Sequence, residues 1–365
     1  MVSFITVTDT VYMKRALVLA RRAQGMTSPN PMVGAVLVKQ GRIIAEGYHK
    51  KAGTPHAEAI AIDAAGSKAA GATLYVTLEP CCHKDKRTPP CTDKIVRSKI
   101  SKVVIAMIDP NPKVSGKGVE ELKKAGITTV SGILDKNARG LNEVYIKHIT
   151  KQTPFVVLKV AMTLDGKIAT PLGESKWITG EKARREVHCL RGRVDAILTA
   201  IGTVKADDPQ LTCRTGNRRD PIRVVLDPEL EISPHAQVVS CPPQTVIVTR
   251  AAASSRKKEL LAGKGVLFIE HEPARVDLGR LLDQLYRMGI TSILVEGGAS
   301  LNSSCLEAGI VDKVMFFIAP KIIGGMNSLP AVGGKIFRSL QHPFMLQRTT
   351  VRRFGNDILV QGYLR

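Results

Sequence analysis

The segment TLEPCCHKDKRTPPC (residues 77–91), together with TPHAEAI (residues 54–60), decides the fold of the first part of the chain. Three cysteines and a histidine fall between positions 81 and 91, and a second histidine and a glutamate stand at positions 56 and 58. A catalytic zinc ion takes three protein ligands from side chains of these types and leaves its fourth position to water. The two segments therefore predict one metal site built from two parts of the chain.

The order of these residues is typical of one kind of zinc chemistry. A His-x-Glu motif followed by Pro-Cys and a second Cys is the signature of zinc-dependent deaminases. There one histidine and two cysteines bind zinc, while the glutamate moves a proton from the attacking water to a ring nitrogen and then to the departing amine. We expect His56, Cys81 and Cys91 to be the ligands and Glu58 to be the proton shuttle.

The choice among the cysteines rests on the Pro-Cys junctions. The short form of the signature is Pro-Cys-x-x-Cys, whereas here CHKDKRTPP separates Cys81 from Cys91. Pro80-Cys81 and Pro90-Cys91 repeat the junction, each before an expected helix start. Cys82 is a weaker choice, because adjacent residues seldom both reach one tetrahedral ion. His83 could also bind the metal, but we expect it to face substrate or solvent. The alternative to a metal site is that the cysteines are buried free thiols and the histidine lies at the surface.

Strands and helices are expected to alternate around these motifs. Thr54 is a plausible N-cap of the helix that carries Glu58, with Pro55 at its first position. The alternation predicts a mostly parallel sheet covered by helices, with the motifs at strand ends and helix starts. The expected helices are 11–23, 56–65, 91–98 and 116–126, and the expected strands are the pair within 34–48, then 72–78, 101–109 and 127–134.

A polar segment at residues 148–155 precedes a fresh apolar strand, so we place a domain boundary near residue 150. The predicted domains are 1–150 and 151–365, a division that suits a chain of 365 residues. The second is a further α/β domain. Its expected strands are 155–161, 194–200, 222–226, 245–249, 292–295, 313–319 and 358–363, and its expected helices are 180–191, 277–288 and 301–308.

Composition narrows the classes of function. The net charge is +21, but the basic residues are scattered and aromatic residues make up only 4% of the chain, so few stacking platforms exist for single-stranded nucleic acid. We therefore expect the positive charge to belong to a solvated surface and to sites for phosphorylated ligands, rather than to a nucleic-acid interface. We expect no membrane span and a cytoplasmic location, where three clustered cysteines indicate metal binding or catalysis rather than disulfides.

Eight segments, which include the metal motif, resemble one enzyme family along nearly the whole chain. SPNPMVGAVLV, GYHKKAGTPHAEA, TLEPCCHKDKRTPPC and DPNPKVSGKG resemble the pyrimidine deaminase half of the bifunctional riboflavin-biosynthesis deaminase/reductases. PFVVLKVAMTLDGKIAT, GESKWITG, GTVKADDPQLTCR and LVEGGASLN resemble the reductase half. The resemblance implies a cytidine-deaminase-like three-layer domain followed by a dihydrofolate-reductase-like domain.

The resemblance also implies a reaction. The family deaminates 2,5-diamino-6-(5-phosphoribosylamino)pyrimidin-4-one with one Zn²⁺ per chain, and then reduces the ribosyl chain to ribityl with NADPH. We therefore expect a phosphorylated pyrimidine as substrate and a homo-oligomer, either a dimer or a tetramer. Asn30, His49 and Asp109 would line the deaminase pocket.

The same comparison assigns the reductase residues. Arg191 and Arg214 offer forked donors suited to a phosphate, and Glu296 is the best candidate to contact the reacting sugar, with Asp207 second. The implied substrate positions are Lys159, Ser175, Thr179, Arg191, Leu211, Arg214 and Glu296. The implied NADPH positions are Ala161, Trp177, Thr203, Asp207, Gly297 and Gly298.

Two positions depart from the family pattern. The usual loop between the two ligand cysteines is one residue shorter and has Ser at position 82, and the family has Gly where this chain has Ala200. No G-x-G-x-x-G fingerprint occurs, so a Rossmann domain is not expected.

Two other functions compete with this interpretation. A zinc deaminase that edits nucleic acid, such as a tRNA adenosine deaminase, explains the metal motif but not the second half of the chain. A non-catalytic zinc-stabilised module would need a fourth protein ligand and has no use for Glu58.

Overall fold

The computed structural model describes residues 7–83, 89–216, 218–272, 276–334 and 338–364. The chain divides into two compact units, Met1–Gln152 and Thr153–Arg365. In the described part of the chain, no helix combines the length and the apolar character that a membrane crossing requires.

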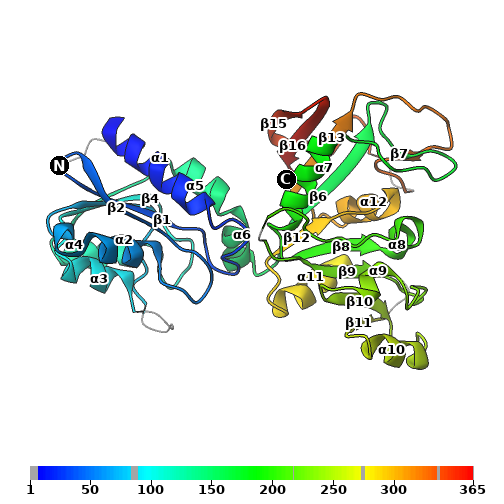
Figure 1. Ribbon diagram of the computed structural model, residues 1–365, viewed down its shortest axis with the longest axis horizontal. Helices are drawn as coiled ribbons and strands as arrows, with labels where there is room; N and C mark the ends of the chain where they lie inside the picture. Colours follow the sequence, from blue (N-terminus) through cyan, green and yellow to red (C-terminus); the bar gives the residue numbers. More distant parts are fainter. Residues whose placement is uncertain (1–6, 84–88, 217, 273–275, 335–337, 365) are drawn as a thin grey trace. The chain divides into compact units, whose positions relative to one another are not determined.

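The first unit is a five-stranded sheet between two layers of helices. Figure 1 shows α1 and α5 on one face of the sheet and α2, α3 and α4 on the other. The strands lie in the order β2-β1-β3-β4-β5. The elements are α1 Val7–Arg21, β1 Gly34–Lys39, β2 Arg42–Tyr48, α2 Ala57–Ala65, η1 Gly66–Ala69, β3 Thr73–Leu78, α3 Cys91–Arg97, β4 Lys102–Met107, α4 Lys117–Lys124, β5 Thr128–Ser131, α5 Asp135–Leu141 and α6 Glu143–Lys151.

Burial explains the central strands of this sheet. Every residue of β3, TLYVTL, is buried or half-buried, as is every residue of β4, KVVIAM, because helices cover both faces. The expectation of a mostly parallel sheet is wrong for this unit. β3–β4 and β4–β5 pair parallel, but β1 pairs antiparallel with β3 and also with β2, to which the tight turn at Gln40-Gly41 joins it directly.

The start of α2 also differs from expectation. The helix begins at Ala57 and His56 is its N-cap residue, so Thr54 is not the N-cap and Pro55 is not the first helical residue. The Thr54 hydroxyl instead donates to the carbonyl of Lys51 at 2.7 Å and closes the preceding turn. As the N-cap residue, His56 therefore precedes the first turn of α2 instead of lying within it.

The second unit is built on a nine-stranded sheet with the order β11-β10-β9-β8-β12-β6-β13-β16-β15. Its strands are parallel from β11 to β13, and β16 and β15 are added antiparallel. Two further strands, β7 Lys167–Ala169 and β14 Leu329–Pro330, pair in a separate two-stranded sheet. The strands of the nine-stranded sheet are β6 Phe155–Thr163, β8 Ala196–Ala200, β9 Ile222–Leu226, β10 Thr245–Arg250, β11 Leu267–His271, β12 Ser292–Val295, β13 Lys313–Ala319, β15 Gln347–Phe354 and β16 Asp357–Tyr363.

Alternate residues of the parallel strands face two separate cores. Val224 and Val295 pack with α11 and α12, whereas Val225 and Leu294 pack with the other face, where α9 and α10 lie. Helix α7 covers the region of β13 and β16 through Ala183. The helices are α7 Glu181–Arg191, α8 Ile201–Asp207, α9 Gln237–Ser240, α10 Ser255–Ala262, α11 Leu278–Arg287 and α12 Ala299–Glu307.

Candidate active sites

The three expected metal ligands meet at one point of the first unit. His56 precedes α2, Cys81 follows β3, and Cys91 is the first residue of α3. His56 Nδ1 lies 3.2 Å from Cys91 Sγ and 3.5 Å from Cys81 Sγ, and the three ligand atoms lie within 4.8 Å of one another. The edges of a tetrahedral zinc site with nitrogen and sulfur ligands are about 3.5–4 Å long, so the three side chains fit such an ion.

Backbone hydrogen bonds hold the two cysteines together. The carbonyl of Cys81 accepts from the backbone N–H of Cys91 at 3.0 Å and from that of Thr92 at 3.3 Å. It thereby satisfies two N–H groups in the first turn of α3, which an isolated helix would leave without partners. The ends of the longer Cys81–Cys91 loop are thus fixed, while residues 84–88 of that loop lie outside the described residues.

Glu58 lies in the first turn of α2, beside the ligand group, and is only 4% exposed. Burial, reinforced by the nearby Cys81, raises the pKa of its carboxyl group above the ordinary value. A raised pKa suits a carboxylate that must take up and release a proton near neutral pH.

Asn30 and His49 face each other next to this centre. Asn30 Nδ2 lies 3.2 Å from His49 Nε2, and His49 Nδ1 lies 3.2 Å from the carbonyl of Pro55. Because a carbonyl can only accept, Nδ1 carries the hydrogen, and burial lowers the pKa of His49. The His49 and His56 rings meet edge to face with centroids 5.3 Å apart, so the expected pocket residues and the metal ligands form one site.

Asn142, which we did not predict, fixes the loop that carries Asn30. Its side chain donates to the carbonyl of Met32 at 3.0 Å and accepts from the Met32 backbone N–H at 2.8 Å. The Asn142 side chain thus bonds both the N–H and the carbonyl of Met32, as the backbone of a neighbouring strand would do. Asn142 is 2% exposed and lies just before α6.

Tyr145, on α6, was also missed, and it contacts the expected pocket residue Asp109. Its hydroxyl donates to Asp109 Oδ1 at 2.9 Å. Burial raises the pKa of Asp109 to about 6, and the hydrogen bonds from Asn111 and Tyr145 oppose that rise. Asn142 is the N-cap residue of α6 and Tyr145 lies in its first turn, so an Asn at a helix start within NEVYIKHI is the signal that could have placed both.

Glu79 joins the loops behind the metal ligands. Its buried carboxylate accepts from the backbone N–H groups of Asp109, Gly116 and Val119, at 3.1, 3.0 and 3.1 Å. A Cβ at Gly118 would lie 2.2 Å from the carbonyl of Pro80, so only glycine permits α4 to pack this closely behind Cys81.

In the second unit, Lys159, Arg191 and Glu296 form a buried ion-pair group. Arg191 donates from Nε and Nη2 to the Glu296 carboxylate at 2.7 and 3.1 Å, and Lys159 Nζ lies 3.1 Å from it. Burial alone would raise the pKa of Glu296, but the two cations outweigh burial and hold that pKa far below its ordinary value. Two cations and one anion give the group one net positive charge.

The expected cofactor and substrate residues meet in two further pairs. Ser175 Oγ donates to Asp207 Oδ1 at 3.0 Å, and a Cβ at Gly298 would lie 4.0 Å from Thr203 Oγ1, so Gly298 and Thr203 are neighbours. Gly297 has a different role. A Cβ there would lie 2.6 Å from Leu301, so its glycine lets α12 pack closely.

The remaining expected residues are spread around this group. Trp177 is 63% exposed with the Arg184 guanidinium 4.7 Å above its ring, so it is not a core residue. Thr179 is buried, and its carbonyl accepts from Arg184. Leu211 is 3% exposed and its side chain packs in a core, which leaves its backbone for any ligand contact.

Arg214 and Ala161 complete the expected set. Arg214 is exposed and donates to Gln210 at 3.0 Å, and Ala161 lies on β6 against the Ala183–Phe317 core.

His188, on α7, was missed by sequence reasoning. Burial, and then the charge of Arg191, lower its pKa.

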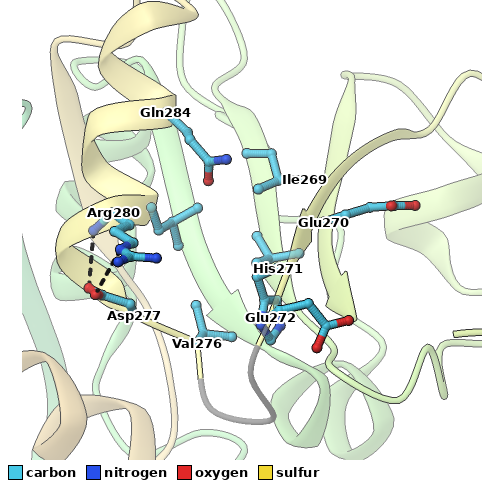
Figure 2. Close-up of a pocket in the computed structure, with 10 residues that line it drawn as sticks. Ile269, Glu270, His271, Glu272, Val276, Asp277, Arg280 and Gln284 are labelled. Carbon is cyan, nitrogen blue, oxygen red and sulfur yellow. Dashed lines mark hydrogen bonds and ion pairs between the residues drawn. The ribbon is translucent and has the colours of Figure 1, made fainter. Parts of the chain in front are cut away.

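Figure 2 shows a separate pocket between β10, β11 and α11. Its lining contains none of the expected site residues. Asp277 caps α11 by accepting from the N–H groups of Gly279 and Arg280 at 2.9 and 3.1 Å, and it pairs with the Arg280 side chain. Asp277 and Arg280 are thus paired with each other, and Glu270 pairs with Lys258 at 2.7 Å.

Comparison with known families covers both units. The family model for the cytidine and deoxycytidylate deaminase zinc-binding region matches residues 6–107, and that for the RibD C-terminal domain matches residues 154–360. The chain is 45% identical over 354 residues to the riboflavin biosynthesis protein RibD of Aquifex aeolicus, covering 96% of this chain and 97% of the relative. It is 42% identical to RibD of Escherichia coli, covering 96% of this chain and 98% of the relative.

Solved structures agree with these matches. RibD of Acinetobacter baumannii superposes with a TM-score of 0.88 at 38% identity, covering 98% of this chain and 99% of that one. A diaminohydroxyphosphoribosylaminopyrimidine deaminase/5-amino-6-(5-phosphoribosylamino)uracil reductase from Thermotoga maritima gives 0.87 at 40% identity, with the same coverage.

Proposed function

Because the chain belongs to the riboflavin biosynthesis protein RibD family, we propose that its two units carry out two consecutive steps of riboflavin biosynthesis. The first is hydrolytic deamination of 2,5-diamino-6-(5-phosphoribosylamino)pyrimidin-4(3H)-one. The second is reduction of the ribosyl chain, which gives 5-amino-6-(5-phosphoribitylamino)uracil. The observation that carries the first step is the meeting of His56, Cys81 and Cys91 beside buried Glu58.

For the deaminase, His56, Cys81 and Cys91 would hold one Zn²⁺ per chain, which lowers the pKa of water and so makes it a nucleophile at neutral pH. Glu58 would accept the proton of the attacking water, pass it to the ring nitrogen and then protonate the leaving amine. Asn30 and His49, 3.2 Å apart, offer donors and acceptors to the edge of the pyrimidine, and Asp109 lies where its carboxylate is oriented by Tyr145.

For the reductase, NADPH would supply the hydride, held by Ala161, Trp177, Thr203, Asp207, Gly297 and Gly298. The start of α12, where Gly298 is the N-cap residue and Thr203 is a neighbour, suits a phosphate of the cofactor, because helix N-terminal N–H groups favour anions. The net positive charge of the Lys159–Arg191–Glu296 group suits a phosphorylated sugar, with Arg214 as an exposed second fork. Ser175, Thr179 and Leu211 would complete the substrate contacts.

The test is incubation of the purified chain with the diaminopyrimidine phosphoribosyl substrate, with and without NADPH, followed by mass spectrometry. Without NADPH, the expected change is the replacement of one amino group by oxygen. With NADPH, two further hydrogens are added. A substrate mass that stays unchanged under both conditions would contradict the proposal. Sedimentation of the same sample tests the accompanying proposal of a homo-oligomer, a dimer or a tetramer.

The nucleic-acid-editing alternative gives residues 154–360 no role, whereas the reductase assignment uses them. Deamination of a tRNA in a parallel assay, without loss of the NADPH absorbance on the pyrimidine substrate, would favour that alternative.

A further inference from the structure

Two side chains of α7 reach one backbone carbonyl. His188 Nδ1 lies 3.2 Å from the carbonyl oxygen of Thr212, and Arg191 Nη1 donates to the same oxygen at 3.3 Å. The two residues are three positions apart and so share a face of the helix. Because the carbonyl can only accept, the His188 hydrogen sits on Nδ1. A carbonyl oxygen has two lone pairs and takes both donors.

The carbonyl belongs to a strip, residues 211–214, that carries two expected substrate positions. Leu211 begins the strip with a left-handed φ of 55° and a side chain that is 3% exposed. Arg214 ends it. A Cβ at Gly192 would lie 2.7 Å from Cys213 Sγ, so the end of α7 packs directly on the strip and restricts the backbone path of the strip.

The N–H groups of Arg191 donate to more than one acceptor. Nε and Nη2 donate to Glu296, which fixes the plane of the guanidinium, so Nη1 stays beside the Thr212 carbonyl and has a second N–H for a ligand. A phosphate oxygen is a stronger acceptor for a guanidinium than a neutral carbonyl. If a bound phosphate weakened the 3.3 Å contact from Nη1 and no other donor were present, the Thr212 carbonyl would lose its hydrogen bond, which is unfavourable in a partly buried site.

We propose that His188 is a positioning residue for the reductase substrate: its Nδ1–H holds the Thr212 carbonyl, which fixes the 211–214 strip and leaves Arg191 Nη1 available to donate to the substrate phosphate. The proposal rests on the reductase function proposed above. His188 touches neither substrate nor cofactor in this assignment. It acts through Thr212 on Arg191 and Arg214.

The experiment compares three variants of the full chain in the reductase assay with the deaminated phosphoribosyl substrate. His188→Leu removes the donor and keeps the bulk, His188→Asn returns an amide N–H close to the position of Nδ1, and His342→Leu is the control at an exposed histidine. The expected result for His188→Leu is a KM for the sugar substrate about three- to tenfold higher, the range that follows from losing one neutral hydrogen bond. Its kcat and its KM for NADPH should stay unchanged, and His188→Asn should recover most of the loss.

Three outcomes would overturn the proposal. They are an unchanged substrate KM in His188→Leu, a fall in kcat larger than the rise in KM, and an equal loss in His188→Leu and His188→Asn with a lower melting temperature in both. Calorimetric titration with ribose 5-phosphate separates this question from the proposed function, because it needs no turnover. If the wild-type chain fails to reduce the substrate, the reductase assignment fails. In that case, weaker ribose 5-phosphate binding in His188→Leu with rescue in His188→Asn still supports the positioning role, and equal or absent binding overturns it.

Discussion

The carboxylate of Glu296 accepts two hydrogen bonds from the guanidinium of Arg191, a residue 105 positions earlier in the chain, at 2.7 and 3.1 Å. The side chains of Glu296 and Arg191 are 8% and 14% exposed. Lys159 adds a second cation at 3.1 Å. The sequence suggested Glu296 as the group that contacts the reacting sugar. The geometry adds another task, which is to hold two buried cations at the reductase site.

The first prediction concerns Glu296→Gln. The substitution removes the anion and leaves two buried cations without a counter-charge, so the free energy of unfolding should fall by about 3 kcal/mol at pH 7. Reductase turnover should fall more than NADPH affinity, because Lys159 and Arg191 lose their fixed positions. Urea unfolding and steady-state kinetics measure the two effects, with exposed Glu259→Gln as the control.

The pH dependence of this variant has a definite sign. The folded-state pKa of Glu296 is depressed below its ordinary value of 4.5, so its ionised form stabilises the fold above that pH, and the contribution is lost as the pH falls further. The stability difference between the wild type and Glu296→Gln should therefore shrink below about pH 4.5. Identical unfolding midpoints for the two proteins at pH 7 would exclude this role for the ion pair.

The second prediction is that Arg214→Ala acts on substrate binding. Arg214 is exposed and contacts Gln210, so its removal leaves no buried charge behind. A charge-assisted contact is worth roughly 1.5–3 kcal/mol, which corresponds to about a ten- to hundredfold higher KM for the phosphorylated substrate. The KM for NADPH and the melting temperature should not change. Arg256→Ala, on the exposed face of α10, is the matched control. A KM that stays at the wild-type value would place the phosphate elsewhere.

How far the sequence predicts this fold depends on how local each signal is. Elements with strong burial were predicted: α11 because its apolar residues follow the helical period, and β4 because it is a short continuous apolar run. Helix α6 was missed because none of its residues is fully buried and no apolar stripe marks it. Strand β15 was missed for a similar reason, since seven of its eight residues are exposed and show no alternation.

The same distinction applies to the sites. The ligand group was predictable because zinc chemistry requires particular residue types at particular spacings, and these stand in the sequence itself. The bond between Asn142 and Met32 joins residues 110 positions apart, and the shared carbonyl of Thr212 depends on the path of a loop. The residue types in the sequence do not indicate contacts of this kind, because any side-chain donor in the right position could make the same hydrogen bond.

The third prediction concerns the identity of the zinc ligands. His56 Nδ1 lies within 3.5 Å of both Cys81 Sγ and Cys91 Sγ, whereas burial raises the pKa of the Cys82 thiol and so disfavours the thiolate that a metal needs. Cys91→Ala should lower the zinc content well below one ion per chain, and Cys82→Ser should keep it near one. Elemental analysis of the purified proteins measures both. Full loss of zinc in Cys82→Ser would show that the wrong pair was chosen.

The fourth prediction is that Glu58→Gln separates the two activities. Glutamine has nearly the same shape but cannot take up or release a proton, so zinc content and fold should persist while deamination falls by about 10²–10⁴-fold or more. Reduction of the already deaminated substrate should continue, because its site lies in the other unit. Mass spectrometry with each substrate in turn reports the two rates. Deamination at close to the wild-type rate would end the assignment of Glu58.

The fifth prediction uses the hydrogen bond from Tyr145 to Asp109. Burial raises the pKa of Asp109 to about 6, and the Tyr145 hydroxyl, 2.9 Å away, opposes that rise by stabilising the ionised form. Tyr145→Phe should therefore raise the pKa of Asp109 further. Because the ionised form predominates only above the pKa, the acidic limb of the deaminase kcat/KM profile should move to higher pH. Tyr12→Phe is the matched control, since its hydroxyl contacts only the carbonyl of Gly41 among the hydrogen bonds seen in the described residues.

The same variant makes a separate prediction about stability. An aspartate whose folded-state pKa lies above the ordinary 3.8 favours the fold most below that pH, and the contribution is lost as the pH rises through about 6. Tyr145→Phe widens the gap between the folded and unfolded pKa values, so its destabilisation should be larger at pH 8 than at pH 4. Equal zinc content in both proteins must be verified first, because a bound cation also lowers the pKa of a nearby carboxyl group. An acidic limb that coincides with that of the wild type, together with a destabilisation independent of pH, would mean that Tyr145 packs against Asp109 without orienting its charge.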